Sequence, residues 1–220
     1  FKTPVKMRKI KHFLEYLLLQ FFLLVCLIIG LKNTRRLGHG LGTVMWRLVP
    51  IRKQTVLQNL TLTGVSENAR QAEHQGREIY RHFGMMVLES LRLPAISREQ
   101  LLNSIATITG QEHLERAMKM GKGVIVLTAH FGNWEYLGAW LGITLNPVWY
   151  LYQSQSNPYV DKVISSYRSR MNMRGIKRGR AVRGYLEALR AGKAVLVLAD
   201  QDAGKAGASI PFLGLPSSTA

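Results

Sequence analysis

We predict an α/β domain with a mostly parallel β-sheet flanked by helices, preceded by an N-terminal hydrophobic membrane helix. Short, almost continuously apolar segments alternate with helical patterns between residues 111 and 199. Residues 13 to 31, FLEYLLLQFFLLVCLIIGL, are apolar apart from Glu15 and Gln20. We therefore expect two parts, a basic and hydrophobic membrane anchor over 1–34 and the main domain over 35–220.

The apolar N-terminal segment predicts a retained helix. As a helix, residues 13 to 31 would be about 28 Å long, close to the hydrocarbon thickness of a bilayer. No small-residue cleavage site follows them, which argues against a signal peptide. Lys and Arg residues lie on both sides of this segment, so their distribution does not set its orientation. A helix that spans the membrane and one that lies in a single leaflet both remain open.

Two further segments precede the alternating region. Residues 35–52 contain Gly38, Gly40 and Gly42, which predict a poor isolated helix with apolar residues that could face lipid. Residues 68–93 show apolar side chains at helical spacing and end before Pro94. A long helix is expected there, with the pair Met85-Met86 in core packing.

The alternating region predicts the sheet. Expected helices cover 111–119, a short stretch from Trp134, 158–171 and 181–190, and expected strands cover 124–129, 148–151 and 194–199. Near-continuous apolar strands separated by helices are typical of a buried parallel sheet. His130 and Asp200 each follow such a strand, and ligand sites of open α/β sheets lie at this edge. We expect both residues to face one cleft.

The charge balance indicates an anionic partner. Lys and Arg number 30 against 13 Asp and Glu, a formal net charge of +17, while 47% of residues are hydrophobic. No zinc-ligand spacing, aromatic RNA-binding strand or helix-turn-helix pattern accompanies this charge, so a membrane surface is favoured over nucleic acid. Cys26 is the single cysteine, which excludes an internal disulfide and a cysteine metal site.

His130 and Glu135 are the candidate catalytic pair. A hydroxyl is a weak nucleophile at neutral pH, and a histidine suits the role of its base. A carboxylate bonded to the second ring nitrogen would fix the tautomer of that histidine. Gly132 permits a tight turn and Asn133 is a good helix N-cap, so the chain can fold Glu135 back toward His130. A histidine and a glutamate at this spacing often occur by chance. The position of His130 directly after a buried strand favours a functional role.

The segment His130-Phe131-Gly132-Asn133-Trp134-Glu135 resembles the H-x4-D/E motif of the late lipid A biosynthesis acyltransferases, the lauroyl and myristoyl transferase family of Gram-negative bacteria. Blocks at Gln58-Asn59-Leu60, at Asn157-Pro158-Tyr159-Val160-Asp161 and at Ala199-Asp200-Gln201-Asp202 are similar to the early, middle and late regions of that family. The fold implied is that of glycerolipid acyltransferases. The chain ends at Ala220 without a closing element, so we expect a C-terminally truncated piece.

The resemblance implies roles for individual residues. His130 would be the general base and Glu135 its orienting carboxylate. Arg168 would bind acceptor phosphate or stabilise the developing oxyanion, and the alternative is a solvated arginine on a basic helix, with Arg170, Arg174, Lys177, Arg178 and Arg180 nearby. Asp200, Asn133 and Arg170 are further candidates for substrate binding, with Asp200 alternatively a cap. No metal is expected.

The implied reaction moves a fatty acyl chain from acyl carrier protein to a hydroxyl of a lipid A precursor, in lipopolysaccharide biosynthesis. The expected partners are the acyl carrier protein, an anionic glycolipid acceptor and the cytoplasmic face of the inner membrane. No cofactor is expected besides the thioester donor. Two alternatives remain: acylation of another membrane glycolipid, such as a phosphoinositol mannoside, from acyl-CoA, and a non-catalytic basic membrane protein.

Overall fold

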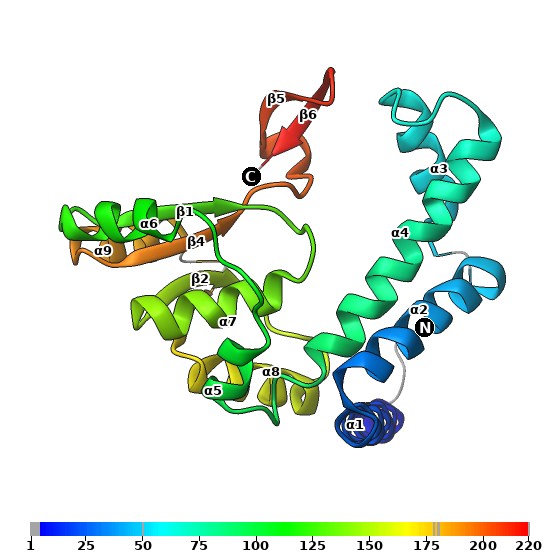
Figure 1. Ribbon diagram of the computed structural model, residues 1–220, viewed down its shortest axis with the longest axis horizontal. Coiled ribbons are helices and arrows are strands. Elements are labelled where there is room, and N and C mark those ends of the chain that lie inside the picture. Colours follow the sequence, from blue (N-terminus) through cyan, green and yellow to red (C-terminus); the bar gives the residue numbers. More distant parts are fainter. Residues whose placement is uncertain (1–4, 50, 178, 180, 220) are drawn as a thin grey trace. The chain divides into compact units, whose positions relative to one another are not determined.

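The computed structural model describes residues 5–49, 51–177, 179 and 181–219 (Figure 1). These residues form two compact units, one of residues 1–21 with 93–199 and one of residues 22–92 with 200–220. The division between the two units falls within the N-terminal helix. The boundary expected at residue 34 separates a membrane anchor from the main domain, and it stays a prediction. Lys2, Arg178 and Arg180, three of the basic residues noted in the sequence, lie outside the described residues.

The first unit contains the predicted parallel sheet. Its strands are β1 (Val124–Thr128), β2 (Val148–Tyr152), β3 (Met173–Lys177) and β4 (Ala194–Leu198). They are arranged in the order β1-β4-β2-β3, and every pairing is parallel. The fold class is thereby confirmed. Strand β3 was not expected, and Arg174 and Lys177, two of the basic residues noted near Arg168, lie in it.

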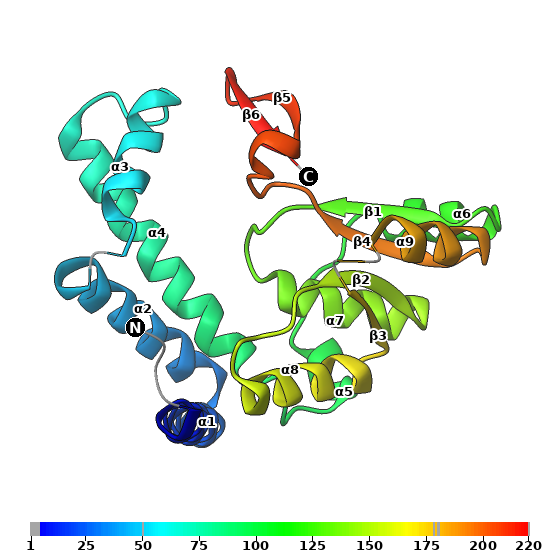
Figure 2. The same ribbon diagram turned by 180° about the vertical axis from the view of Figure 1, so that it is seen from behind.

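Helices cover both faces of the sheet. They are α5 (Arg98–Asn103), α6 (Gln111–Lys119), α7 (Trp134–Leu145), α8 (Pro158–Arg170) and α9 (Ala181–Arg190). A Cβ added at Gly138 of α7 would meet Met173, whereas one at Gly184 of α9 would meet Ile176. Because Met173 and Ile176 point to opposite faces of β3, α7 and α9 lie on opposite sides of the sheet (Figures 1 and 2).

The core of this unit lies between α7 and the sheet. Its buried side chains come from α5, α7, α8, the strands and the turns next to them, and they include Leu93, Leu101, Leu141, Val148, Met171 and Leu196. Edge strand β1 is less well covered, since Ile125 is 60% and Leu127 is 70% exposed on the face opposite α7. The expectation of strands buried on both faces therefore holds for β4 and not for β1.

Asparagine side chains start the helices that border the site. The side chain of Asn133 accepts a hydrogen bond from the backbone N–H of Tyr136 at 3.2 Å and caps α7. The side chain of Asn157 accepts from Tyr159 N–H and caps α8, where Pro158 occupies the first helical position. An N-cap oxygen satisfies backbone N–H groups that have no partner within the helix.

The second unit is built on two helices in close contact, α2 (Gly30–Leu48) and α4 (Ala69–Ser90), with α3 (Lys53–Leu62) beside α4. The glycines explain the close approach. A Cβ on Gly42 would lie 2.2 Å from the carbonyl oxygen of Tyr80, and one on Gly84 would lie 2.4 Å from that of Gly38. The glycine-containing segment that looked like a poor isolated helix is thus a helix stabilised by packing.

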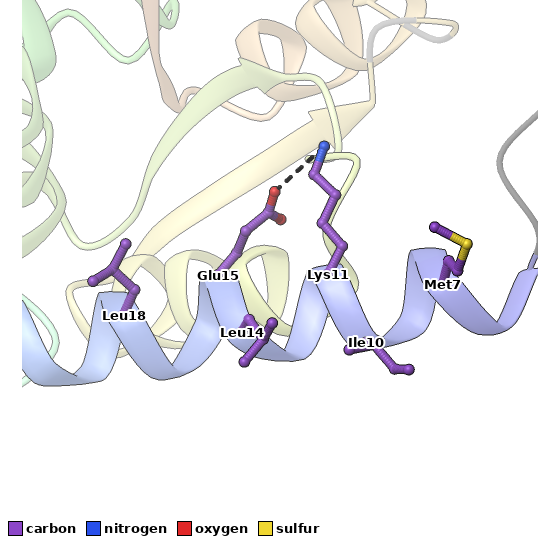
Figure 3. Close-up of a pocket in the computed structure, with 6 residues that line it drawn as sticks. All are labelled: Met7, Ile10, Lys11, Leu14, Glu15 and Leu18. Carbon is purple, nitrogen blue, oxygen red and sulfur yellow. Dashed lines mark ion pairs between the residues drawn. The ribbon is translucent and has the colours of Figure 1, made fainter.

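The N-terminal helix α1 (Val5–Ile28) agrees with the predicted apolar helix. Its stretch Met7–Ile28 is long and apolar enough to cross a membrane, judged by length and composition, and little of that stretch is buried. Gly30, the first residue of α2, has φ +74° and turns the chain after α1. Figure 3 shows Ile10 and Leu14 projecting to a different side of α1 from the ion pair of Lys11 and Glu15.

Glu15 is also bonded within the first unit. The Nδ2 of Asn157 donates 2.8 Å hydrogen bonds to the carbonyl of His12 and to the carboxylate of Glu15. The rings of Phe13 and Tyr16 pack against Tyr159, with centroids 6.2 and 5.7 Å away. The N-terminal half of α1 is thereby attached to the start of α8, which explains the polar residue within the apolar run.

The last described residues form a hairpin. Strand β5 (Ala208–Phe212) pairs antiparallel with β6 (Leu215–Thr219), and the short 3-10 helix η2 (Gly204–Ala206) precedes them. Leu213 and Gly214 both have positive φ, as a two-residue hairpin turn requires. The segment between Asp202 and Pro211 thus lies partly in η2 and partly in this hairpin.

Candidate active site

His130 lies where the sequence placed it, at the carboxyl edge of the sheet. Strand β1 ends at Thr128, so His130 is two residues beyond the strand, and α7 begins at Trp134. Gly132 has φ +59°, a conformation that favours glycine, and it turns the chain between strand and helix. The predicted strand, turn, cap and helix are all present.

The imidazole of His130 packs against the indole of Trp134. Their ring centroids are 4.9 Å apart and their planes are inclined by 72°, an edge-to-face arrangement. This contact restrains the imidazole, which is partly exposed and therefore accessible to a substrate. Trp134, one residue before Glu135, therefore has a definite structural role in the motif.

The carboxylate of Glu135 is held by two residues at the end of α8. The Nε of Arg168 donates to Oε2 at 3.2 Å, and Nη2 of the same guanidinium donates to Oε1. The hydroxyl of Tyr167 also donates to Oε2. Glu135 thus forms a bidentate contact with Arg168 and accepts a hydrogen bond from the phenol of Tyr167. These two partners are adjacent in sequence.

This ion pair is mostly shielded from solvent. The side chain of Arg168 is 20% exposed and that of Glu135 is 14% exposed. The guanidinium carbon of Arg168 also lies 5.0 Å from the ring centroid of Tyr150, a buried residue of β2. Helix polarity contributes in the same direction, because the acid lies in the first turn of α7 and the arginine in the last turn of α8.

The surroundings alter the acidity of this cluster. Burial raises the pKa of the Tyr167 hydroxyl, and the neighbouring Glu135 carboxylate raises it further. Burial alone would lower the pKa of Arg168, but the hydrogen bonds and charge of Glu135 outweigh it, so this pKa is raised. Both groups therefore keep their protons at physiological pH and remain donors to the carboxylate.

Asp200 follows strand β4 as His130 follows β1. Thr128 pairs with Leu198 in the register of these parallel strands, and each of the two polar residues lies two positions further on. Asp200 belongs to the second unit, and its expected place in a common cleft stays a prediction.

Arg170 and Asn133 have local contacts. The Nη2 of Arg170 donates to the backbone carbonyls of Leu93 and Pro94 at 2.9 and 2.6 Å, where it joins the end of α8 to the segment before α5. Asn133 caps α7. These contacts give both residues a structural reason to be present, and their expected contact with substrate stays a prediction.

An apolar cavity borders the first turn of α7, the turn that carries Glu135. It has a volume of about 450 Å³ and lies between the loop at 105–111, Val126 of β1 and the face of α7 that begins one residue after Glu135. Its lining includes Ile108, Leu114, Val126, Tyr136, Leu137 and Trp140. Such a volume and lining are typical of a pocket for an apolar ligand.

Tyr167 and Tyr150 are the members of this cluster that the sequence did not reveal. Tyr167 precedes Arg168, and Tyr150 stands in a predicted strand, but neither position has a spacing that signals chemistry. Among the described residues, no group of three or more His, Cys, Asp or Glu side chains is arranged to hold a metal ion.

The sequence is similar to those of known bacterial proteins. Residues 2–220 match the family model described as bacterial lipid A biosynthesis acyltransferase. The chain is 28% identical over 180 residues to the lipid A biosynthesis palmitoleoyltransferase of Escherichia coli, which covers 81% of this chain and 58% of that protein. The lipid A biosynthesis acyltransferase of Shigella flexneri matches to the same extent. The chain thus spans less than two thirds of the length of these relatives.

A shorter match reaches a second kind of protein. Over 60 residues, 27% of this chain, the sequence is 35% identical to the phosphatidylinositol mannoside acyltransferase of Mycobacterium tuberculosis, of which it covers 19%.

Proposed function

The chain belongs to the bacterial lipid A biosynthesis acyltransferase family, and we propose that it transfers a fatty acyl chain to a hydroxyl of a lipid A precursor. The observation that carries this proposal is the carboxylate of Glu135, fixed by Arg168 and Tyr167 in the first turn after the His130 loop. The carboxylate held by these two donors lies five residues after an accessible imidazole, and acyl transfer to a hydroxyl needs a base of this kind and a carboxylate that orients it.

In this mechanism His130 removes the proton from the acceptor hydroxyl. The resulting oxygen nucleophile attacks the thioester carbonyl and forms a tetrahedral intermediate, which collapses with breakage of the carbon–sulfur bond. The imidazolium then returns the proton to the departing thiolate, so that ester and free thiol are the products. Glu135 orients the imidazole and stabilises the imidazolium.

Arg168 acts through Glu135 in this proposal. Its Nε and Nη2 are both directed at the carboxylate, which argues for positioning rather than for the phosphate or oxyanion contact expected from the sequence. Tyr167 supplies the third hydrogen bond to the same carboxylate. Rigid support of this kind keeps a catalytic group in the productive geometry.

The donor would be the thioester of acyl carrier protein, with no further cofactor. An acidic carrier suits a chain whose net charge is +17. The cavity beside α7 would take the acyl chain, since it is lined mainly by apolar side chains and starts next to Glu135. The exposed apolar residues of α1 would hold the protein at the cytoplasmic face of the inner membrane, where such an acceptor is made.

A second candidate acceptor is another membrane glycolipid, acylated from acyl-CoA. The 60-residue similarity to a phosphatidylinositol mannoside acyltransferase favours it, and the same residues would perform the chemistry. The two candidates differ in acceptor and donor, and not in mechanism.

The test is mass spectrometry of lipid A from cells that carry or lack the gene for the full-length protein. We expect one acyl chain to be missing without the gene, and to return with the wild-type protein but not with His130→Ala. Membrane association of His130→Ala should persist. A complete lipid A in the deleted strain would reject the lipid A acceptor, and full activity of His130→Ala would reject the mechanism.

A further inference from the structure

A second cavity, of about 540 Å³, lies among α2, α3 and α4 in the second unit. Four of its lining residues carry a permanent positive charge: Arg47, Lys53, Arg70 and Arg77. Glu73 is the acidic residue of the lining, and His74 and Trp46 complete it. The wall of this cavity, which we call the basic pocket, is therefore strongly positive.

Lys53 and Glu73 neutralise each other. The Nζ of Lys53 donates to Oε1 of Glu73 at 2.8 Å, and the indole N–H of Trp46 donates to the same oxygen at 2.9 Å. The pKa of Glu73 lies below its usual range, mainly because of the hydrogen bond from Lys53. The Lys53 ammonium also lies 4.1 Å from the Trp46 ring centroid. The carboxylate of Glu73 is thus paired with Lys53, and the net charge of the basic pocket comes from its three arginines.

The arginines have little compensation within the protein. The side chains of Arg47 and Arg70 are exposed, and they form no hydrogen bond or ion pair with another described residue. The Nε of Arg77 is buried and lacks a hydrogen-bond partner within the described part of the chain. The nearby Glu78 lies 3.9 Å from that nitrogen but is bonded at 2.8 Å by Arg81. Three guanidinium groups that line one concave wall repel one another unless an anion joins them.

A phosphate group fits this wall. Guanidinium groups bind phosphate oxygens through paired N–H donors, and a phosphomonoester offers three oxygens and nearly two negative charges.

The residues beside the pocket point to a lipid as the source of the phosphate. Val44 lies three residues before Arg47 on the same side of α2, and Leu48 lies one turn after Val44; they are 49% and 74% exposed. Ile51, just beyond α2, is 61% exposed. Exposed apolar side chains next to a basic pocket are typical of a surface that meets the headgroup region of a bilayer.

We propose that the basic pocket binds the phosphomonoester headgroup of a membrane lipid. The site lies wholly within the second unit, and the proposal does not depend on the transfer reaction. A membrane phosphate held by Arg47, Arg70 and Arg77 would anchor the protein on lipids that carry this group and would concentrate it on membranes rich in them.

The test is co-sedimentation of the full chain with phosphatidylcholine vesicles that contain phosphatidic acid, a phosphomonoester, or phosphatidylglycerol, a phosphodiester. The fractions of the two anionic lipids are adjusted to give equal surface potential. The pocket variant Arg47→Gln/Arg70→Gln leaves the Lys53–Glu73–Trp46 contacts intact. The control variant Lys119→Gln/Arg190→Gln removes the same charge from exposed positions of α6 and α9. Arg77→Gln is a second, independent pocket variant, and circular dichroism checks folding.

We expect wild type and control to bind phosphatidic acid vesicles at least about fivefold more tightly than phosphatidylglycerol vesicles, and both pocket variants to lose this preference. Added inorganic phosphate should reduce the preference of the wild type. Equal binding to the two lipids would overturn the proposal, because charge alone would then explain it. Equal losses in pocket and control variants would overturn it as well. Binding of inorganic phosphate without any vesicle preference would assign the pocket to a soluble phosphate instead.

Discussion

At the scale of single residues, the site depends on how one carboxylate is held. Glu135 could in principle rotate about its side-chain bonds, but Tyr167 and Arg168 bond both of its oxygens. The energetic value of each bond is larger than at the surface, because both residues of the ion pair are mostly shielded from water. A test of positioning must therefore remove a hydrogen bond without removing the carboxylate.

Tyr167→Phe is such a change, because it deletes the phenol hydroxyl and keeps the ring. We expect kcat to fall about tenfold, which corresponds to about 1.4 kcal/mol of transition-state stabilisation, while KM stays within about twofold. Tyr152→Phe, on strand β2, is the matched control and should leave both constants unchanged. Steady-state kinetics with an acyl carrier donor measures this. An unchanged kcat in Tyr167→Phe would show that Arg168 alone positions Glu135.

At the scale of helices and strands, much of the structure followed from the sequence. The helix at 111–119, the cap at Asn133 and the strands β1, β2 and β4 were predicted because apolar periodicity and capping residues act locally. Strand β3 was missed because Met173–Lys177 carries two cations and a glycine, and its strand conformation comes from pairing with β2.

The site shows the same contrast between local and distant information. The turn at Gly132 and the place of His130 depend on neighbours in sequence and were predicted. The contacts of Glu135 join α7 to residues more than thirty positions away in α8, and only the packing of α8 along the sheet brings them together. For the same reason Gly38 and Gly42 looked unfavourable until the contact between α2 and α4 was known.

The contact between α2 and α4 gives a direct prediction. Gly42→Ala would place a methyl group 2.2 Å from the carbonyl oxygen of Tyr80, so the helices must separate, and we expect the free energy of unfolding to fall by about 1–3 kcal/mol. Gly40→Ala, two residues earlier in the same helix, has no atom within 4 Å of the added Cβ and should raise stability by up to about 1 kcal/mol. Urea unfolding in detergent compares the two. Equal effects of both substitutions would contradict the close packing.

At the scale of the whole molecule, apolar exposure and positive charge act together on membranes. Met7, Ile10, Leu14, Leu18 and Phe21 of α1 are each more than half exposed and recur at helical spacing (Figure 3 shows the first four). Such a stripe on a helix with basic residues binds a bilayer through apolar burial and through attraction to anionic lipids. Apolar burial alone, or attraction to anionic lipids alone, would bind the bilayer more weakly than the two together.

Leu14→Asp/Leu18→Asp should therefore weaken binding to anionic vesicles by at least about a hundredfold, since two leucines lose burial in the bilayer and two negative charges are added. Ser165→Asp/Ser169→Asp adds the same charge to exposed positions of α8 and should change binding far less. Vesicle flotation measures both variants. Similar losses in the two would mean that net charge, and not the apolar stripe, governs attachment.

Alkaline stability is a property of the whole chain, because the buried Tyr150 and Tyr167 and the half-buried Tyr185 contribute to it. Burial raises the pKa of Tyr150, Tyr167 and Tyr185 above the ordinary value of about 10. Below that pH these tyrosines are protonated in the folded and the unfolded state, and they cause no pH dependence. Above it the unfolded chain loses their protons while the folded chain keeps them. The free energy of unfolding should then fall by up to about 1.4 kcal/mol per pH unit for each tyrosine, until the folded pKa is reached.

Other groups of the chain also lose protons at alkaline pH, so the informative quantity is the difference between variants. Tyr167→Phe should reduce the slope of unfolding free energy against pH, between about pH 10 and 11, by close to the share of one tyrosine. Tyr159→Phe, at a 43% exposed position of α8, should leave the slope as it is. Urea unfolding at a series of pH values gives these slopes. If Tyr167→Phe kept the wild-type slope, Tyr167 would lose its proton in the folded chain as readily as in the unfolded one, and its hydrogen bond to Glu135 would have to be weak.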